Sequence, residues 1–302
     1  MNICITPTRL HGSVVVPSSK SIGHRELICA ALAQGESVVE NISVSQDIEA
    51  TCRLLQAFGA SIEEIPSAYE GRTAYRVKGG LTKQGEALTV DCGESGSTLR
   101  FLIPIGLYSG NTVVYTGRGQ LVKRPLEPYY RIFDEHSVSY KPTEGGLPLT
   151  VEGCLQPGRY ALAGDVSSQF FTGLLVMLPL LDGDSVLEST TPLESLSYVT
   201  MTLDCMARHG VDVQWDGGRL FHIPGNQRYM AGTYAVEGDY SQAAFWLAAG
   251  TLGHSVECLG LRHSSSQGDE VIVSILQRMG AVIGQTDSIA AHPSQLTGQV
   301  ID

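Results

Sequence analysis

The chain has 302 residues, of which 43% are hydrophobic and 17% charged, and its net charge is −11. This length exceeds what one hydrophobic core usually supports, so we expect two domains in a globular protein. The acidic charge and the lack of a Lys- or Arg-rich run argue against nucleic acid or anionic lipid as a partner. The longest apolar runs are too short to span a membrane, so no membrane partner is expected.

The cysteines and the first residues indicate the compartment. The seven cysteines are odd in number and lie far apart, and the eight histidines show no HExxH pairing. This spacing predicts neither a disulfide framework nor a metal site. The opening residues MNICITPTRLHG lack the basic start and apolar stretch of a secretory signal. We therefore expect a reduced, cytoplasmic protein.

Four passages share one pattern, in which a turn rich in Ser, Asp and Gly opens an apolar helix. After each helix we expect a β-branched strand, a second, amphipathic helix and a further strand. The spacing predicts an α+β fold with about four repeated βαβαββ units. The first helices are expected within 18–33, 93–107, 164–178 and 238–252, the strands after them within 35–42, 110–117, 183–190 and 253–260, and the second helices within 47–60, 126–137, 197–210 and 269–281.

The first-helix starts carry both capping residues and cations. Taken singly, each Ser or Asp is an ordinary N-cap and each cation a solvated surface charge. Helix N-termini that converge on one cleft would instead form an anion site, through their amides and dipoles. Arginine suits bidentate contacts and lysine a point charge, so the cluster predicts a receptor for phosphate and carboxylate. The cations are Lys20, Arg25, Arg100, Lys123 and Arg124.

Six motifs resemble the 5-enolpyruvylshikimate-3-phosphate synthase family, in the family's order, and the likeness runs from about residue 4 to the last residue. The related UDP-N-acetylglucosamine enolpyruvyl transferases share the repeat fold. They normally carry Lys-Asn at Lys20-Ser21 and a loop cysteine that GRGQLVKRP lacks, so this alternative ranks second. The motifs are PSSKSIGHR (17–25), CGESGSTLRFL (92–102), KRPLEP (123–128), VSSQFFTGLL (166–175), EGDYSQAAFWLAAG (237–250) and SSSQGD (264–269).

The resemblance implies that the carboxyvinyl group of phosphoenolpyruvate is transferred to the 5-hydroxyl of shikimate 3-phosphate, releasing phosphate without a cofactor. It implies Lys20 as the catalytic candidate, with a simple anion clamp as its alternative role. The implied ligands of shikimate 3-phosphate are Ser21, Arg25, Ser167, Ser168, Gln169, Ser195 and Tyr198. Those of phosphoenolpyruvate are Lys20, Gly96, Arg100, Arg124 and Gln169.

The resemblance also implies six units in two domains that close on the ligands. We expect a first domain of three units over 14–228 and a partial second domain from 1–13 and 229–302. The family's later acid–base segments have no counterpart here, which predicts weak binding and impaired turnover. A non-catalytic fragment that binds anionic metabolites is therefore the alternative function, and a structural repeat scaffold ranks third. An incomplete second domain would expose apolar faces and favour self-association.

Overall fold

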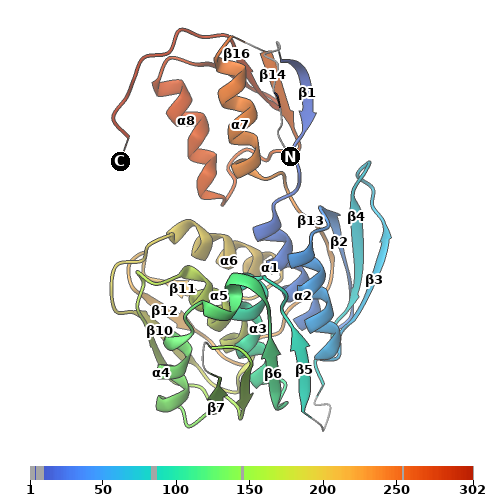
Figure 1. The fold of residues 1–302 in the computed structure, drawn as a ribbon, viewed down its shortest axis with the longest axis vertical. Coiled ribbons are helices and arrows are strands. Elements are labelled where there is room, and N and C mark those ends of the chain that lie inside the picture. Colours follow the sequence, from blue (N-terminus) through green and yellow to red (C-terminus); the bar gives the residue numbers. More distant parts are fainter. Residues whose placement is uncertain (1–3, 5–9, 83–86, 144–145, 254, 302) are drawn as a thin grey trace. The chain divides into compact units, whose positions relative to one another are not determined.

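The computed structural model describes residue 4 and residues 10–82, 87–143, 146–253 and 255–301 (Figure 1). It divides into two compact units. The larger comprises Lys20–Val236, and the smaller comprises Met1–Ser19 and Glu237–Asp302. None of the described helices has the length and apolar character needed to cross a bilayer.

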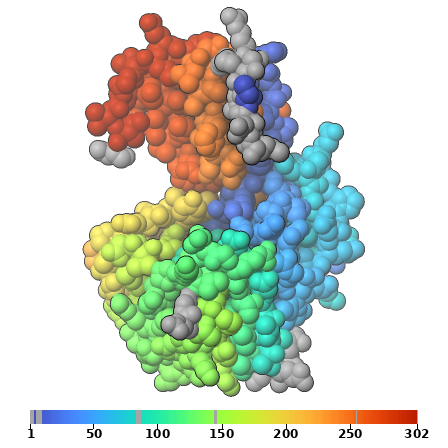
Figure 2. Space-filling model, in the orientation of Figure 1, coloured from blue at the N-terminus to red at the C-terminus, as the bar shows by residue number. Residues whose placement is uncertain are grey.

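The larger unit contains three four-stranded sheets with the same arrangement. In each, the first and second strands in space run parallel, the third runs antiparallel to the second, and the fourth runs antiparallel to the third. On the face shown in Figure 2, the surface of the larger unit passes from blue through green to yellow as the chain advances. In spatial order the strands are β13 (Thr233–Ala235), β2 (Glu36–Ile42), β4 (Thr73–Lys78) and β3 (Ser61–Pro66); β5 (Leu88–Asp91), β6 (Val113–Thr116), β8 (Leu149–Glu152) and β7 (Ser139–Pro142); and β9 (Arg159–Leu162), β10 (Ser185–Ser189), β12 (Leu220–Ile223) and β11 (Gln214–Trp215).

Two kinds of helix connect these strands. The first helices, α1 (Lys20–Leu32), α3 (Gly96–Tyr108) and α5 (Ser168–Met177), lie buried inside the unit, with the sheets around them (Figure 1). Most side chains of α3 and α5 are apolar, whereas α1 also buries His24, Arg25 and Glu26. The second helices are amphipathic and keep one face exposed. They are α2 (Gln46–Ala57), α4 (Glu127–Glu135) and α6 (Leu196–Arg208); the short 3₁₀ helices are η1 (Gly119–Lys123) and η2 (Leu178–Leu180).

The smaller unit repeats the same arrangement once around its own core, which includes Val16, Tyr240 and Leu247. The predicted α+β fold is confirmed, and the four sheets share one strand arrangement. Its strands, in spatial order, are β1 (His11–Val15), β14 (Ser255–Leu259), β16 (Ile289–His292) and β15 (Val282–Gln285); its helices are α7 (Tyr240–Thr251), η3 (Gly268–Glu270) and α8 (Val271–Arg278).

The limits of the two units differ from the predicted domain limits of 14–228 for the first domain and 1–13 with 229–302 for the second. The reason is strand pairing. β13 lies in parallel beside β2, so the chain up to Val236 stays with the larger unit. β1 lies in parallel beside β14, so the chain up to Ser19 stays with the smaller one.

Candidate active site

The start of α3 brings two polar side chains close to its backbone. Gly96 is buried, and a Cβ there would lie 2.9 Å from Nη1 of Arg124 and 3.6 Å from Oε1 of Gln169. Ser95 caps the helix, because its hydroxyl accepts a hydrogen bond from the backbone N–H of Thr98 at 3.1 Å. The missing side chain at Gly96 therefore allows Arg124 and Gln169 to approach a helix N-terminus.

Arg100, one turn into α3, is a buried cation. Its Nη1 donates to Oε1 of Gln169 at 2.8 Å, and its Nη2 donates to the carbonyl of Pro125 at 3.1 Å. Its Nε is buried without a partner, and its guanidinium lies 4.8 Å from the centre of the Phe170 ring. Burial, followed by repulsion from Arg124, lowers the pKa of Arg100. Two neighbouring guanidinium groups, one of them bonded to neutral partners, create a local positive potential in an acidic protein.

The start of α5 presents hydroxyl and amide groups to the same place. Ser167 caps α5 by accepting a hydrogen bond from the backbone N–H of Gln169 at 3.3 Å, which leaves its own hydroxyl proton able to donate. Ser168 follows it and is buried. The side chain of Gln169 bridges the two helix starts, because its Nε2 donates to the hydroxyl of Ser97 on α3 at 3.0 Å.

Lys20, the first residue of α1, is held at the starts of α2 and α3. Its Nζ lies 2.7 Å from Oδ2 of Asp47, and both side chains are partly exposed. The hydroxyl of Thr98 donates to the backbone carbonyl of Asp47 at 3.2 Å. So exposed an ion pair contributes little to stability, and its effect is to orient the ammonium group.

Arg25 is another buried cation of the predicted site, only 2% exposed, and its guanidinium is bonded entirely to protein groups. Its Nε donates to the hydroxyl of Thr202 at 2.8 Å, and its Nη1 donates to the carbonyl of Ser21 at 2.7 Å. Its Nη2 donates to the hydroxyl of Thr172 at 3.2 Å and to the carbonyl of Tyr198 at 3.0 Å. Burial lowers the pKa of Arg25 to about 10. These bonds tie α1 to α5 and α6.

The start of α6 carries two exposed residues of the predicted site. Ser195, its N-cap, has the left-handed backbone angles φ 54° and ψ 40°, and its side chain makes no capping bond. Such a conformation in a residue other than glycine costs about 1 kcal/mol or more and is common at ligand sites. Tyr198 is 39% exposed, while the Arg25 bond fixes its backbone.

The structure therefore places the predicted residues on four helix starts and one loop of the larger unit. Direct contacts join Arg124, Gly96, Gln169 and Arg100. Thr172, which lies on α5 like Gln169, accepts a hydrogen bond from Arg25. Asp47 pairs with Lys20 and accepts a hydrogen bond from Thr98, which lies on α3 like Gly96 and Arg100. Among the described residues, no three His, Cys, Asp or Glu side chains gather as a metal site.

Sequence reasoning missed a buried chain of hydrogen bonds beneath this site. Nδ1 of His24 lies 2.8 Å from the hydroxyl of Thr51, which lies 2.7 Å from that of Thr98. The hydroxyl oxygen of Thr98 in turn lies 2.7 Å from that of Ser95. Burial lowers the pKa of His24 to about 3, so its ring is neutral. The sequence holds no signal for this chain of bonds, because it joins three helices. Ser97 was also missed, although its position directly after Gly96 in the CGESGSTLRFL motif was a signal that could have found it.

Comparison with known proteins identifies the relatives of this chain. The profile of the family described as EPSP synthase (3-phosphoshikimate 1-carboxyvinyltransferase) matches residues 5–302. A protein of Clostridium kluyveri named 3-phosphoshikimate 1-carboxyvinyltransferase is 48% identical over 301 residues, which are 99% of this chain and 69% of that protein. Its namesake from Clostridium acetobutylicum is 46% identical over 299 residues, again 99% of this chain and 69% of the relative.

Solved structures show the same fold. An EPSP synthase from Acinetobacter baumannii superposes with a TM-score of 0.81 at 22% sequence identity, covering 97% of this chain and 67% of that one. A second structure of EPSP synthase from this organism gives a TM-score of 0.80 at 23% identity, covering 96% and 67%.

Proposed function

The chain belongs to the EPSP synthase family, and from this membership we propose that it transfers the carboxyvinyl group of phosphoenolpyruvate to the 5-hydroxyl of shikimate 3-phosphate, releasing phosphate. One observation within the larger unit carries the proposal. Arg100 and Arg124 meet at a glycine-opened helix start, and Arg100 has only neutral partners there. Two guanidinium groups gathered at one helix start favour an anionic ligand.

Phosphoenolpyruvate is the ligand that we assign to this pair of guanidinium groups. Arg124 is exposed and would contact a phosphate or carboxylate from solvent, whereas Arg100 is held by its bonds to Gln169 and Pro125. Gly96 leaves its backbone N–H open to close approach by the anion. The fixed cation would define the place of the ligand, and the exposed one would hold it there.

Shikimate 3-phosphate is assigned to the starts of α5 and α6. Ser167, Ser168 and Gln169 offer hydroxyl and amide donors where the dipole of α5 favours an anion. Ser195 and Tyr198 are exposed at the start of α6, whose backbone Arg25 fixes. We assign Arg25 mainly to positioning, with Ser21 beside it as a ligand.

Lys20 is the candidate for charge stabilisation or proton transfer. Its ammonium group is exposed, and Asp47 orients it. An exposed ammonium group on a flexible stem suits an anion clamp, which makes this the simpler of its two roles. The structure of the site supports either role, and the kinetics of the Lys20→Met variant separate them. Loss of an anion clamp would raise the KM, whereas loss of a proton donor would lower kcat.

A phosphate-release assay with both substrates tests the proposed reaction. Replacing Arg124 with Gln should raise the KM for phosphoenolpyruvate roughly tenfold or more, because one charge-assisted hydrogen bond contributes about 1.5–3 kcal/mol. The matched control is Arg118→Gln, a nearby exposed arginine that pairs with Asp91 at 3.6 Å. Equal KM values for the two variants would refute the assignment.

Binding measurements with the same protein and substrates distinguish the alternative function, anion binding without catalysis, from the proposed reaction. Calorimetric binding of shikimate 3-phosphate without phosphate release would favour it. The impaired turnover expected for the 302-residue chain stays a prediction, which the rate of phosphate release measures. The curated relatives carry the name of the shikimate enzyme, so the UDP-N-acetylglucosamine alternative has no further support.

A further inference from the structure

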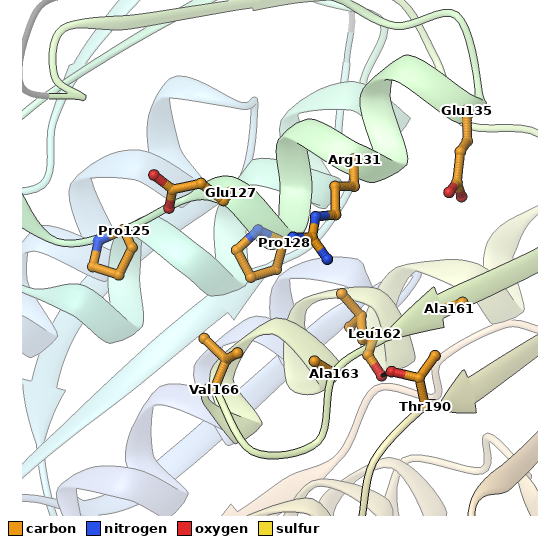
Figure 3. Close-up of a pocket in the computed structure, with 10 residues that line it drawn as sticks. All are labelled: Pro125, Glu127, Pro128, Arg131, Glu135, Ala161, Leu162, Ala163, Val166 and Thr190. Atoms are coloured by element: carbon orange, nitrogen blue, oxygen red, sulfur yellow. Dashed lines mark hydrogen bonds between the residues drawn. The ribbon is translucent and has the colours of Figure 1, made fainter.

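A pocket of about 350 Å³ lies between α4 and the segment that joins β9 to α5 (Figure 3). It belongs entirely to the larger unit and contains none of the residues assigned to the two substrates. Pro125, Pro128, Leu162 and Val166 give it apolar walls, and all of its charged groups come from α4. Its volume lies within the range of small-molecule sites, which combine apolar walls with a few polar groups.

The charged groups are Glu127, Arg131 and Glu135, spaced one helical turn apart. Charges at this spacing usually pair along a helix. Within the described part of the chain these three form no ion pair with each other or with any neighbour. Figure 3 shows the Arg131 guanidinium directed past Pro128 toward Leu162, with the two glutamates on either side of it along α4.

This charge pattern limits the ligand. A guanidinium group binds a carboxylate in bidentate fashion. One guanidinium and two carboxylates among the lining residues leave the pocket net negative, which disfavours a simple anion and favours a ligand that also carries a positive group. We propose that the pocket binds an α-amino acid with an apolar side chain. Its carboxylate meets Arg131, its ammonium group meets a flanking glutamate, and its side chain packs on Leu162 and Val166.

The pocket also touches two supports of the anion site. The carbonyl of Pro125 accepts the hydrogen bond from Nη2 of Arg100. Val166 immediately precedes Ser167, the N-cap of α5. A ligand seated between Pro125 and Val166 acts on both, so its binding changes the affinity for shikimate 3-phosphate. This second step depends on the proposed function, whereas amino-acid binding does not.

Calorimetry with three compounds of one shape tests the ligand class. L-Leucine should bind, and leucinamide, which lacks the carboxylate, and 4-methylpentanoate, which lacks the ammonium group, should each bind at least tenfold more weakly. Analogues that bind as well as leucine would overturn the zwitterion assignment. Absence of leucine binding at millimolar concentrations would overturn the site.

Substitutions inside and outside the pocket test whether leucine binds there. Arg131→Gln should weaken leucine binding about tenfold or more, in line with loss of a charge-assisted hydrogen bond. Arg159→Gln is the matched control, because Arg159 is exposed on β9, pairs with Glu188 and lies outside the pocket. Unchanged leucine affinity in Arg131→Gln would refute the site.

The coupling is measured by titrating shikimate 3-phosphate with and without saturating leucine. A change of threefold or more in its dissociation constant supports the coupling, and an unchanged constant overturns it. If shikimate 3-phosphate does not bind at all, the proposed function fails, while the leucine titration still decides the fate of the pocket.

Discussion

Arg100 and Arg124 carry the same charge but are placed very differently. Arg100 is 6% exposed and bonded on two sides, while Arg124 is exposed and lies against Gly96. The two cations therefore differ in exposure: Arg100 is fixed by its hydrogen bonds, and Arg124 is open to solvent. The sequence shows only that both arginines lie within motifs, and it does not reveal this difference. We therefore make one prediction for Gly96, whose backbone lies against Arg124, and another for the buried His24.

Gly96→Ala should reduce substrate affinity without destabilising the fold. The new methyl group would lie 2.9 Å from Nη1 of Arg124, the end of a flexible side chain that can move away. We expect an unchanged melting temperature and a KM for phosphoenolpyruvate raised about tenfold, which corresponds to roughly 1.4 kcal/mol. A fall in melting temperature with an unchanged KM would show that Gly96 is needed for packing instead.

His24 should make the protein sensitive to acid. Its folded-state pKa of about 3 lies below the ordinary value of 6.5, so the unfolded chain binds the proton first as the pH falls. Its contribution is complete above pH 6.5 and is lost toward pH 3, at up to about 1.4 kcal/mol per pH unit. Urea unfolding of His24→Asn should show a shallower loss of stability between pH 6.5 and pH 4.

The exposed His222 provides the control for this measurement. His222→Asn should keep the pH slope of the parent chain. Identical slopes in the parent and in His24→Asn would mean that His24 is not a buried neutral group.

At the scale of elements, the periodic pattern was sufficient for most helices and strands. The starts of α1, α3, α5 and α7 fall within the predicted passages, because capping residues and apolar runs are local signals. β13 was not predicted as part of the larger unit, because three residues carry no period and its partner β2 lies far away in sequence. The burial of Arg25 was likewise hidden, since it depends on three helices packing together.

Arg25 is predicted to stabilise this packing. Arg25→Met would remove one donor from each of four acceptors, the hydroxyls of Thr172 and Thr202 and the carbonyls of Ser21 and Tyr198. The two hydroxyls keep their bond to each other, and that of Thr202 keeps its bond to the Tyr198 carbonyl. Because a lost hydrogen bond to a charged group is worth about 1.5–3 kcal/mol, we expect a loss of about 3 kcal/mol in the free energy of unfolding. Urea denaturation measures it, with Arg53→Met, an exposed change on α2, as the control. Equal stability of the two variants would contradict a positioning role.

At the scale of the whole molecule, the chain repeats one βαβαββ unit four times and spans about 69% of its relatives' length. The smaller unit exposes large apolar side chains on α7 and directly after it: Phe245 is 74% exposed, and Leu252, the C-cap of α7, is 71% exposed. Because exposed apolar groups of this size commonly mark contact surfaces, we propose that this face mediates self-association.

Sedimentation of the 302-residue chain tests self-association. The parent chain should form dimers or larger species at micromolar concentration, and Phe245→Ser with Leu252→Ser should shift it toward monomer. Tyr69→Ser is the control, since Tyr69 is 46% exposed on the larger unit. A monomeric parent chain would contradict the proposal.

The proposed function requires that the starts of α3 and α5 form a single binding site for the two anionic substrates. A crystal structure of the chain soaked with shikimate 3-phosphate tests it most directly. We predict the phosphate within hydrogen-bond distance of Ser167, Ser168 and Gln169. Phosphate bound elsewhere on the molecule, with these three side chains free of ligand, would contradict it.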